Sequence, residues 1–111
     1  MRIWDIQCNK LCDKHLLGEH RELHAIFTYL TTDKGGSYKK HPETLRWVNK
    51  CGLLSERHTE QVEEMKRRGW NHKSPLDASK VDYGDKVQDK FVNTLEQQIE
   101  ILKAKGCKYM L

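Results

Sequence analysis

Six polar side chains that could do chemistry crowd one short stretch of the chain: His15, Glu19, His20, Arg21, Glu22 and His24. Because a helix advances 100° per residue, residues seven apart differ by only about 20° in azimuth. His15 and Glu22 therefore lie two turns apart on one line of the helix. This line borders an apolar stripe, because Leu11 and Ile26 lie close to it. We expect Glu22 to be partly buried, where a carboxylate suits proton transfer. The alternative is a solvated helix face with ordinary ion pairs.

The same stretch contains possible zinc ligands. His20 and His24 stand at i, i+4, a spacing that lets two imidazoles bind one metal ion. Glu22, however, stands one position later than a zinc-protease helix requires, which turns it by about 100°. Cys8 and Cys12 have a loose C-x3-C spacing, and the other two cysteines stand alone. The sequence predicts no metal site, and a small zinc-binding protein that uses these residues remains an alternative.

Helical patterns dominate the chain. We expect a first helix from an N-cap at Asn9 to about Leu30, with Asp13 in its first turn. Pro42 suits the start of a second helical stretch that Gly52 weakens and Gly69 ends. A long polar connection over 71–84 precedes a last helix over about 85–105. The expected apolar faces are Leu16, Leu23, Ile26, Phe27 and Leu30; Leu45, Trp47 and Val48; and Val87, Phe91, Leu95, Ile99 and Leu102.

These patterns predict an all-α fold, a small single-domain bundle of three to four helices with irregular connections over residues 1–111. The chain has 111 residues, 32% of them charged, and a net charge of +4, which permits a polyanionic partner. No apolar run reaches the roughly 18 residues of a membrane span. Asp5 interrupts the apolar start of the chain, so we expect no signal peptide. We therefore expect a cytoplasmic protein, nucleoid-associated in a prokaryote, whose cysteines are free thiols. The three tryptophans are expected in the core or at its rim.

Residues 11–23, LCDKHLLGEHREL, resemble the first helix of the pyrimidine-dimer DNA glycosylases with AP-lyase activity, the phage endonuclease V type. Residues 64–71, EMKRRGWN, resemble the end of a central helix in that family. Residues 41–47, HPETLRW, and 71–76, NHKSPL, resemble its shorter cellular members. Two features depart from the family pattern: Ala25 occupies a basic position of the first helix, and the C-terminal aromatic-basic segment is not recognisable.

The resemblance implies a catalytic pair. The family uses the α-amine of the first residue as its nucleophile, and the ungapped register of His15 and Glu22 puts Met1 at that position. Arg2 is too bulky for the usual removal of an initiator methionine, so Met1 should be retained. Glu22 matches the catalytic carboxylate. The implied DNA-binding residues are Arg2, His15, Arg21, Lys66, Arg67, Arg68 and Lys73.

The resemblance also implies the substrate and the partners. The expected substrate is double-stranded DNA that contains ultraviolet lesions or abasic sites, handled without a metal or other cofactor. Neither a membrane nor an obligatory protein partner is expected, and the protein should be a monomer. A non-catalytic helical nucleic-acid-binding module is the main alternative, since the basic residues 66–68 also fit a helix end favoured by the dipole.

Overall fold

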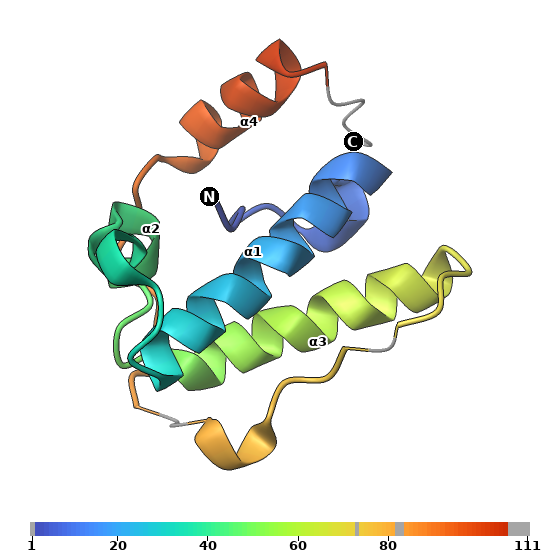
Figure 1. Ribbon diagram of the computed structural model, residues 1–111. Helices are drawn as coiled ribbons and strands as arrows, with labels where there is room; N and C mark the ends of the chain where they lie inside the picture. The colour runs from blue at the N-terminus through green and yellow to red at the C-terminus, as the bar shows by residue number, and fades with distance from the viewer. Residues whose placement is uncertain (1, 73, 82–83, 107–111) are drawn as a thin grey trace.

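The computed structural model describes residues 2–72, 74–81 and 84–106 (Figure 1). Every regular element in those ranges is helical, which confirms the predicted all-α fold. Short 3-10 turns cover Cys8–Lys10, Gly36–Lys40 and Ala78–Lys80, and the α-helices are α1 (Asp13–Thr31), α2 (Pro42–Leu45), α3 (Cys51–Arg67) and α4 (Leu95–Ala104). Within the described part of the chain, no helix is long and apolar enough to cross a membrane.

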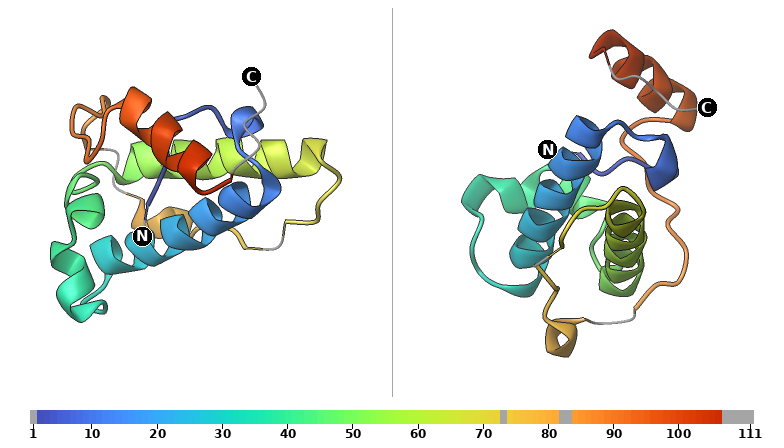
Figure 2. Two further views of the ribbon diagram at one scale, coloured as in Figure 1. Left: turned by 90° about the horizontal axis from the view of Figure 1, so that it is seen from above. Right: turned by 90° about the vertical axis from the view of Figure 1, so that its right-hand side faces the viewer.

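Helices α1 and α3 lie side by side, with α2 at one end and α4 above the N-terminal segment (Figures 1 and 2). Two apolar clusters hold this arrangement together. The first joins the N-terminal segment to α1, α3 and α4 through Trp4, Ile6, Cys8, Leu11, Leu16, Met65 and Leu102. The second lies at the α2 end and contains Ile3, Leu23, Ile26, Phe27, Trp47 and Leu54. Burial of Trp4 and Trp47 confirms the expectation for these two tryptophans.

Helix α1 begins three residues later than predicted, since its N-cap is Cys12 rather than Asn9. Asn9 lies inside the 3-10 turn, and Cys12, with extended backbone, is the N-cap. Leu11 is also extended and fully buried, so its burial in the first cluster interrupts the helix before Asp13. Asp13 does occupy the first turn, and the predicted apolar stripe is buried except for the half-buried Leu30.

The second helical stretch is two separate helices. Pro42 starts α2 as predicted, and the Nδ1 of His41 accepts a hydrogen bond from the Glu43 amide. The chain then turns through Asn49 at a φ of 62° before α3 begins. Leu45 and Val48 were predicted to be buried on the basis of one continuous helix. Because the helix is interrupted here, that spacing no longer applies, and both side chains are exposed.

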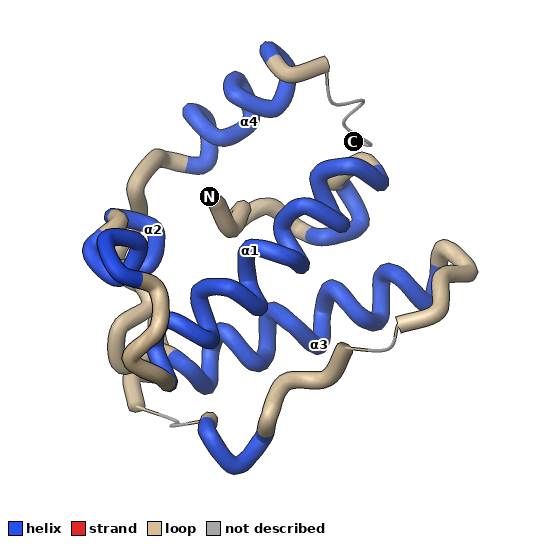
Figure 3. The backbone as a smooth tube through the Cα atoms, in the orientation of Figure 1, coloured by secondary structure: helices blue, strands red, loops and turns tan. Residues whose placement is uncertain are grey.

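The last helix is half the predicted length, because α4 begins at Leu95 rather than near residue 85. Thr94 and Gln97 form a capping box that fixes its start. The preceding segment instead satisfies buried cations: Gln88 and Asp89 bind the Lys50 ammonium at 2.9 Å each, and the Lys90 carbonyl accepts from Arg46. Consequently the predicted core residues Val87, Phe91 and Leu95 are exposed, while Ile99 and Leu102 do pack inward. The described residues of the predicted polar connection, 71–72, 74–81 and 84, have no α-helix and run below α3 in the view of Figure 3.

The N-terminal segment is buried although it has no regular structure. Long polar side chains satisfy its backbone on both sides. Glu43, Glu19 and Gln98 accept from the amides of Ile3, Trp4 and Asp5 at 3.1, 2.6 and 2.8 Å, and Arg46 and Arg57 donate to the carbonyls of Ile3 and Ile6 at 2.8 and 2.7 Å. Chain ends are usually poorly ordered unless they are tied down in this manner. The fold therefore fixes the path of the chain from residue 3 onward.

Candidate active site

A pocket of about 420 Å³ lies where the N-terminal segment, α1 and the end of α4 meet. Its lining residues are Arg2, Trp4, Lys14, His15, Gly18, Glu19, Glu22 and Lys105. His15 and Glu22, which the sequence places on one helix line, both line this pocket, and Glu22 is half-buried as expected. The structure thus brings together Arg2, His15 and Glu22, three residues that the sequence marked as functional.

Gly18 opens the floor of this pocket between His15 and Glu22. A Cβ built on Gly18 would meet no atom within 4 Å, although the residue lies in the middle of α1. Glycine costs about 0.5–1 kcal/mol relative to alanine inside a helix. Glycine is therefore found, despite its lower helix propensity, at a position where a larger side chain would project into the pocket.

We expect Gly18→Ala to raise the free energy of unfolding by about 0.5–1 kcal/mol, because it removes backbone freedom without a clash. Gly18→Leu should place a side chain in the pocket and reduce the DNA cleavage that the family resemblance implies, while the fold persists. Thermal unfolding followed by circular dichroism, together with a cleavage assay, measures both effects. A fully active Gly18→Leu variant would show that the substrate does not enter this pocket.

The surroundings of His15 favour its neutral form. Its Nδ1 lies 2.9 Å from the Cys12 thiol, and its ring stands edge-on to Trp4 with centroids 6.1 Å apart. Burial lowers the pKa of His15, and the nearby Lys105 and Lys14 ammonium groups lower that pKa further. At neutral pH the ring therefore offers a hydrogen bond rather than a fixed positive charge.

Glu19 forms the inner wall of the pocket and is fully buried. Its carboxylate accepts from the Trp4 amide, from the Arg57 guanidinium at 2.8 and 3.2 Å, and from the Gln61 amide. This buried ion pair holds the N-terminal segment against α1. Sequence reasoning grouped Glu19 with the polar face but missed this role, because Arg57 and Gln61 lie about forty residues away.

Three cationic side chains surround the mouth of the pocket. The Arg2 guanidinium lies over the Trp4 ring, 5.0 Å from its centroid, and donates to the Asn93 side-chain oxygen. Lys14 and Lys105 are exposed and also line the pocket. The sequence did not single out these two lysines. Lys14 lacked a motif of its own, and only the fold brings Lys105 from the far end of the chain.

The remaining predicted DNA-binding residues lie outside the lining of this pocket. Arg21 is exposed on α1, and Lys66 is exposed at the end of α3. Arg67 and Arg68 both pair with Glu64 and hold the pKa of its carboxyl below the usual value. Met1 and Lys73 fall outside the described residues.

Arg68 has a structural role in addition to any contact with DNA. Its side chain is only 10% exposed and pairs with Asp13 at 2.8 Å. It also donates to the carbonyls of Cys8 and Leu11 at 3.2 and 2.6 Å. These bonds tie the end of α3 to the turn before α1, so Arg68 holds together the elements that carry the pocket.

The i, i+4 histidines His20 and His24 lie in a different group. They meet His58 of α3 and His72 of the following connection, whereas Cys8 is buried in the first cluster and Cys12 contacts His15. Burial lowers the pKa values of His20, His24 and His58, that of His58 to about 4. The sequence could not find this group, since no local motif links residues 20, 58 and 72.

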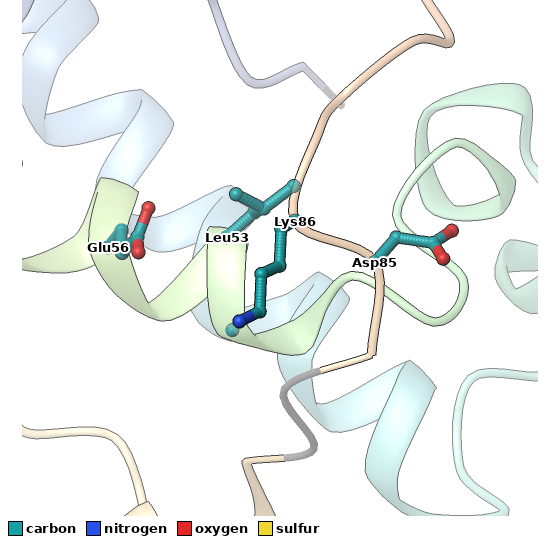
Figure 4. A pocket seen from close by; sticks show the side chains of 5 residues that line it. Leu53, Glu56, Asp85 and Lys86 are labelled. Carbon is teal, nitrogen blue, oxygen red and sulfur yellow. The ribbon is translucent and has the colours of Figure 1, made fainter.

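A further pocket of about 330 Å³ lies between the first turns of α3 and residues 85–86. Figure 4 shows the Leu53 and Lys86 side chains between Glu56 and Asp85, so the two carboxylates do not face each other. None of the residues that the sequence marked as functional lines this pocket. It therefore lacks the paired groups that make the α1 pocket the candidate active site.

Comparison with known proteins agrees with the geometry. The family model for pyrimidine dimer DNA glycosylase matches residues 1–78, which include the N-terminal segment, α1, α2 and α3. No curated protein and no solved structure matches the chain. The match covers well over half of the sequence and every lining residue of the pocket except Lys105. The chain belongs to the pyrimidine dimer DNA glycosylase family.

Proposed function

We propose that this protein is a bifunctional DNA glycosylase and AP lyase whose nucleophile is the α-amine of Met1 and whose catalytic carboxylate is Glu22. An α-amine has a reference pKa of about 7.7–8.0, so a useful fraction is unprotonated at neutral pH. Its substrate is duplex DNA that carries a pyrimidine dimer or an abasic site.

The proposed reaction begins when the amine lone pair attacks C1′ of the damaged nucleotide. The C1′–N bond to the base breaks, and the base leaves with the bonding electrons and accepts a proton. Opening of the sugar ring gives a protonated imine between the protein and C1′. Removal of a C2′ proton then expels the 3′ phosphate by β-elimination, which cuts the strand, and water hydrolyses the imine. Glu22 stabilises the cationic intermediates and transfers these protons.

The observation that carries this proposal is that Arg2 and Glu22 line the same pocket. A peptide bond joins Arg2 directly to the residue that bears the amine. The buried, hydrogen-bonded path of residues 3–6 further supports a functional chain end, because nucleophilic attack needs a defined position. Glu22 comes from a rigid helix, which supports the same conclusion for the carboxylate.

The surroundings of the pocket support a nucleotide as the occupant. Arg2, Lys14 and Lys105 supply positive charge on its rim, and the neutral His15 supplies a hydrogen bond. A base inside a duplex cannot reach such a pocket, so the damaged nucleotide must be extruded, at a cost that is lowest for weakly paired lesions. Exposed Arg21 and Lys66 extend the basic surface beyond the pocket.

We expect Lys14→Ala and Lys105→Ala each to weaken binding to abasic-site duplex and to reduce the slope of log K against log salt by about 0.9. The reason is that each lysine at the rim neutralises one phosphate and releases its counterion. Titrations from 50 to 300 mM salt measure the slope, and Lys34→Ala, in the exposed loop after α1, serves as the control. An unchanged slope in both rim variants would place the backbone contacts elsewhere.

Borohydride trapping tests the proposed function. Tag-free protein, its N-terminus confirmed by mass spectrometry, is mixed with ultraviolet-irradiated or abasic duplex and with borohydride, which reduces an imine to a stable bond. Adducts on both duplexes that map to Met1 support the glycosylase and lyase activities. An adduct on the abasic duplex alone restricts the protein to lyase chemistry. Salt-sensitive binding without an adduct would instead support the non-catalytic nucleic-acid-binding module.

A further inference from the structure

Four histidines from three separate parts of the chain converge next to the active pocket. His20 and His24 come from α1, His58 from α3, and His72 from the connection that follows α3. Ring centroids of five of their pairs lie 4.7–5.1 Å apart. One ring nitrogen from each of the four lies within 4.8 Å of the others. Imidazole nitrogens are common metal ligands, so their close approach here indicates a site at which one metal ion could bind.

The surrounding hydrogen bonds fix the tautomers of two of these rings. The Gln61 amide nitrogen donates to the Glu19 carboxylate, so the Gln61 oxygen faces His20 Nδ1 at 2.8 Å. His20 therefore carries its proton on Nδ1 and its lone pair on Nε2. The Nε2 of His58 lies 3.0 Å from the Ser74 carbonyl, which can only accept. The lone pair of neutral His58 is consequently on Nδ1.

One nitrogen inside the cluster is left without a hydrogen-bond partner among the described residues. His72 Nε2 is buried and has no hydrogen-bond partner within the described ranges. His20 Nε2 and His24 Nε2 lie 3.2 Å apart. Two nitrogens bound to one tetrahedral zinc ion at 2.0–2.1 Å are about 3.3 Å apart, so this pair already has the spacing of zinc ligands.

We propose that His20, His24, His58 and His72 bind one zinc ion as a four-coordinate structural site. Imidazole nitrogen suits zinc, and four protein ligands close its coordination shell. The Glu19–Gln61–His20 chain of hydrogen bonds is the kind of outer contact that orients a metal-bound imidazole.

The proposed zinc ion joins α1, α3 and the connection after α3. It also braces Glu19, whose carboxylate forms the inner wall of the active pocket. This site replaces the donor set considered from the sequence, in which Cys8 and Cys12 accompanied the two α1 histidines. The proposal does not depend on the lyase chemistry, because its ligands lie outside the lining of the active pocket.

The test uses the full-length protein without a histidine tag, purified without chelator. We expect elemental analysis to give about one zinc per chain. Stripped protein should regain one equivalent, with a melting temperature raised by about 10 °C at a hundredfold excess of free zinc over Kd. Cobalt in place of zinc should give the visible absorption of a four-coordinate site. Folded wild-type protein that holds less than one tenth of an equivalent, and shows neither shift nor absorption, would overturn the proposal.

Variants locate the site. His24→Asn and His72→Asn should each lower zinc affinity at least tenfold. His41→Asn is the matched control, because asparagine can replace His41 as the N-cap of α2 and His41 is not in the cluster. Loss of zinc in His41→Asn, or full retention in both cluster variants that remain folded, would place the metal elsewhere and contradict the assignment.

Discussion

Replacement of Glu22 by glutamine should lower the rate of strand cleavage at abasic sites by about 10²–10⁴-fold, the usual contribution of a positioned acid-base group. Glutamine keeps the size of the side chain, but it can neither stabilise a cationic imine by charge nor accept the C2′ proton. Because Glu22 is half-buried on the wall of the pocket, the substitution leaves the core intact. Single-turnover cleavage of an abasic duplex is the direct measurement.

Binding and stability separate this effect from a general loss of structure. Glu22→Gln should bind abasic duplex at least as tightly as the wild type, since one negative charge near the DNA is removed, and its melting temperature should change little. Glu56→Gln, which alters an exposed carboxylate on α3, should cleave at the wild-type rate. Near-normal cleavage by Glu22→Gln would assign the proton transfers to another group.

Displacement of the terminal amine should have an even larger effect. An alanine added before Met1 leaves a free α-amine of ordinary pKa but moves it by about 3.8 Å, the spacing of consecutive Cα atoms. Since a shift of 1 Å can cost about 10²-fold, both cleavage and borohydride trapping should fall below detection. Mass spectrometry must show that the added residue is retained.

Chemical blocking provides the complementary control. Acetylation of the Met1 amine removes the nucleophile without a change of position, so trapping should vanish while salt-sensitive DNA binding persists. Both modified proteins should keep the wild-type melting temperature, because the hydrogen bonds of residues 3–6 are untouched. An adduct that forms normally and maps to a lysine, for example Lys14 or Lys105, would identify that lysine rather than Met1 as the nucleophile.

The sequence correctly predicted the features that local periodicity controls. The apolar stripe of α1 follows from side chains at helical spacing, and the shared helix line of His15 and Glu22 follows from their seven-residue separation. The start of α2 at Pro42 and the end of α3 before Gly69 follow from the backbone restrictions of those two residue types. Each of these features depends on neighbours within two turns.

Other local predictions were overridden by distant contacts. Residues 85–94 have a helical pattern, yet Gln88, Asp89 and the Lys90 carbonyl bind the buried cations Lys50 and Arg46 instead. A buried charge without a partner costs more than a few residues gain from helix formation, so tertiary pairing decides the backbone there. The sequence of residues 85–94 alone does not reveal that Lys50 and Arg46 need these partners.

Tertiary structure alone decided how the two sites are built. Only the folded chain brings Lys105 to the pocket of Glu22, pairs Glu19 with Arg57, and places His58 and His72 against the histidines of α1. Helical spacing determines which residues share a face, because the backbone repeats every 3.6 residues. Which faces meet depends on the burial of apolar surface and on the pairing of buried charges over the whole chain. The sequence by itself therefore determined that His15 and Glu22 share one line on α1, and only the tertiary structure completed the pocket and the histidine cluster.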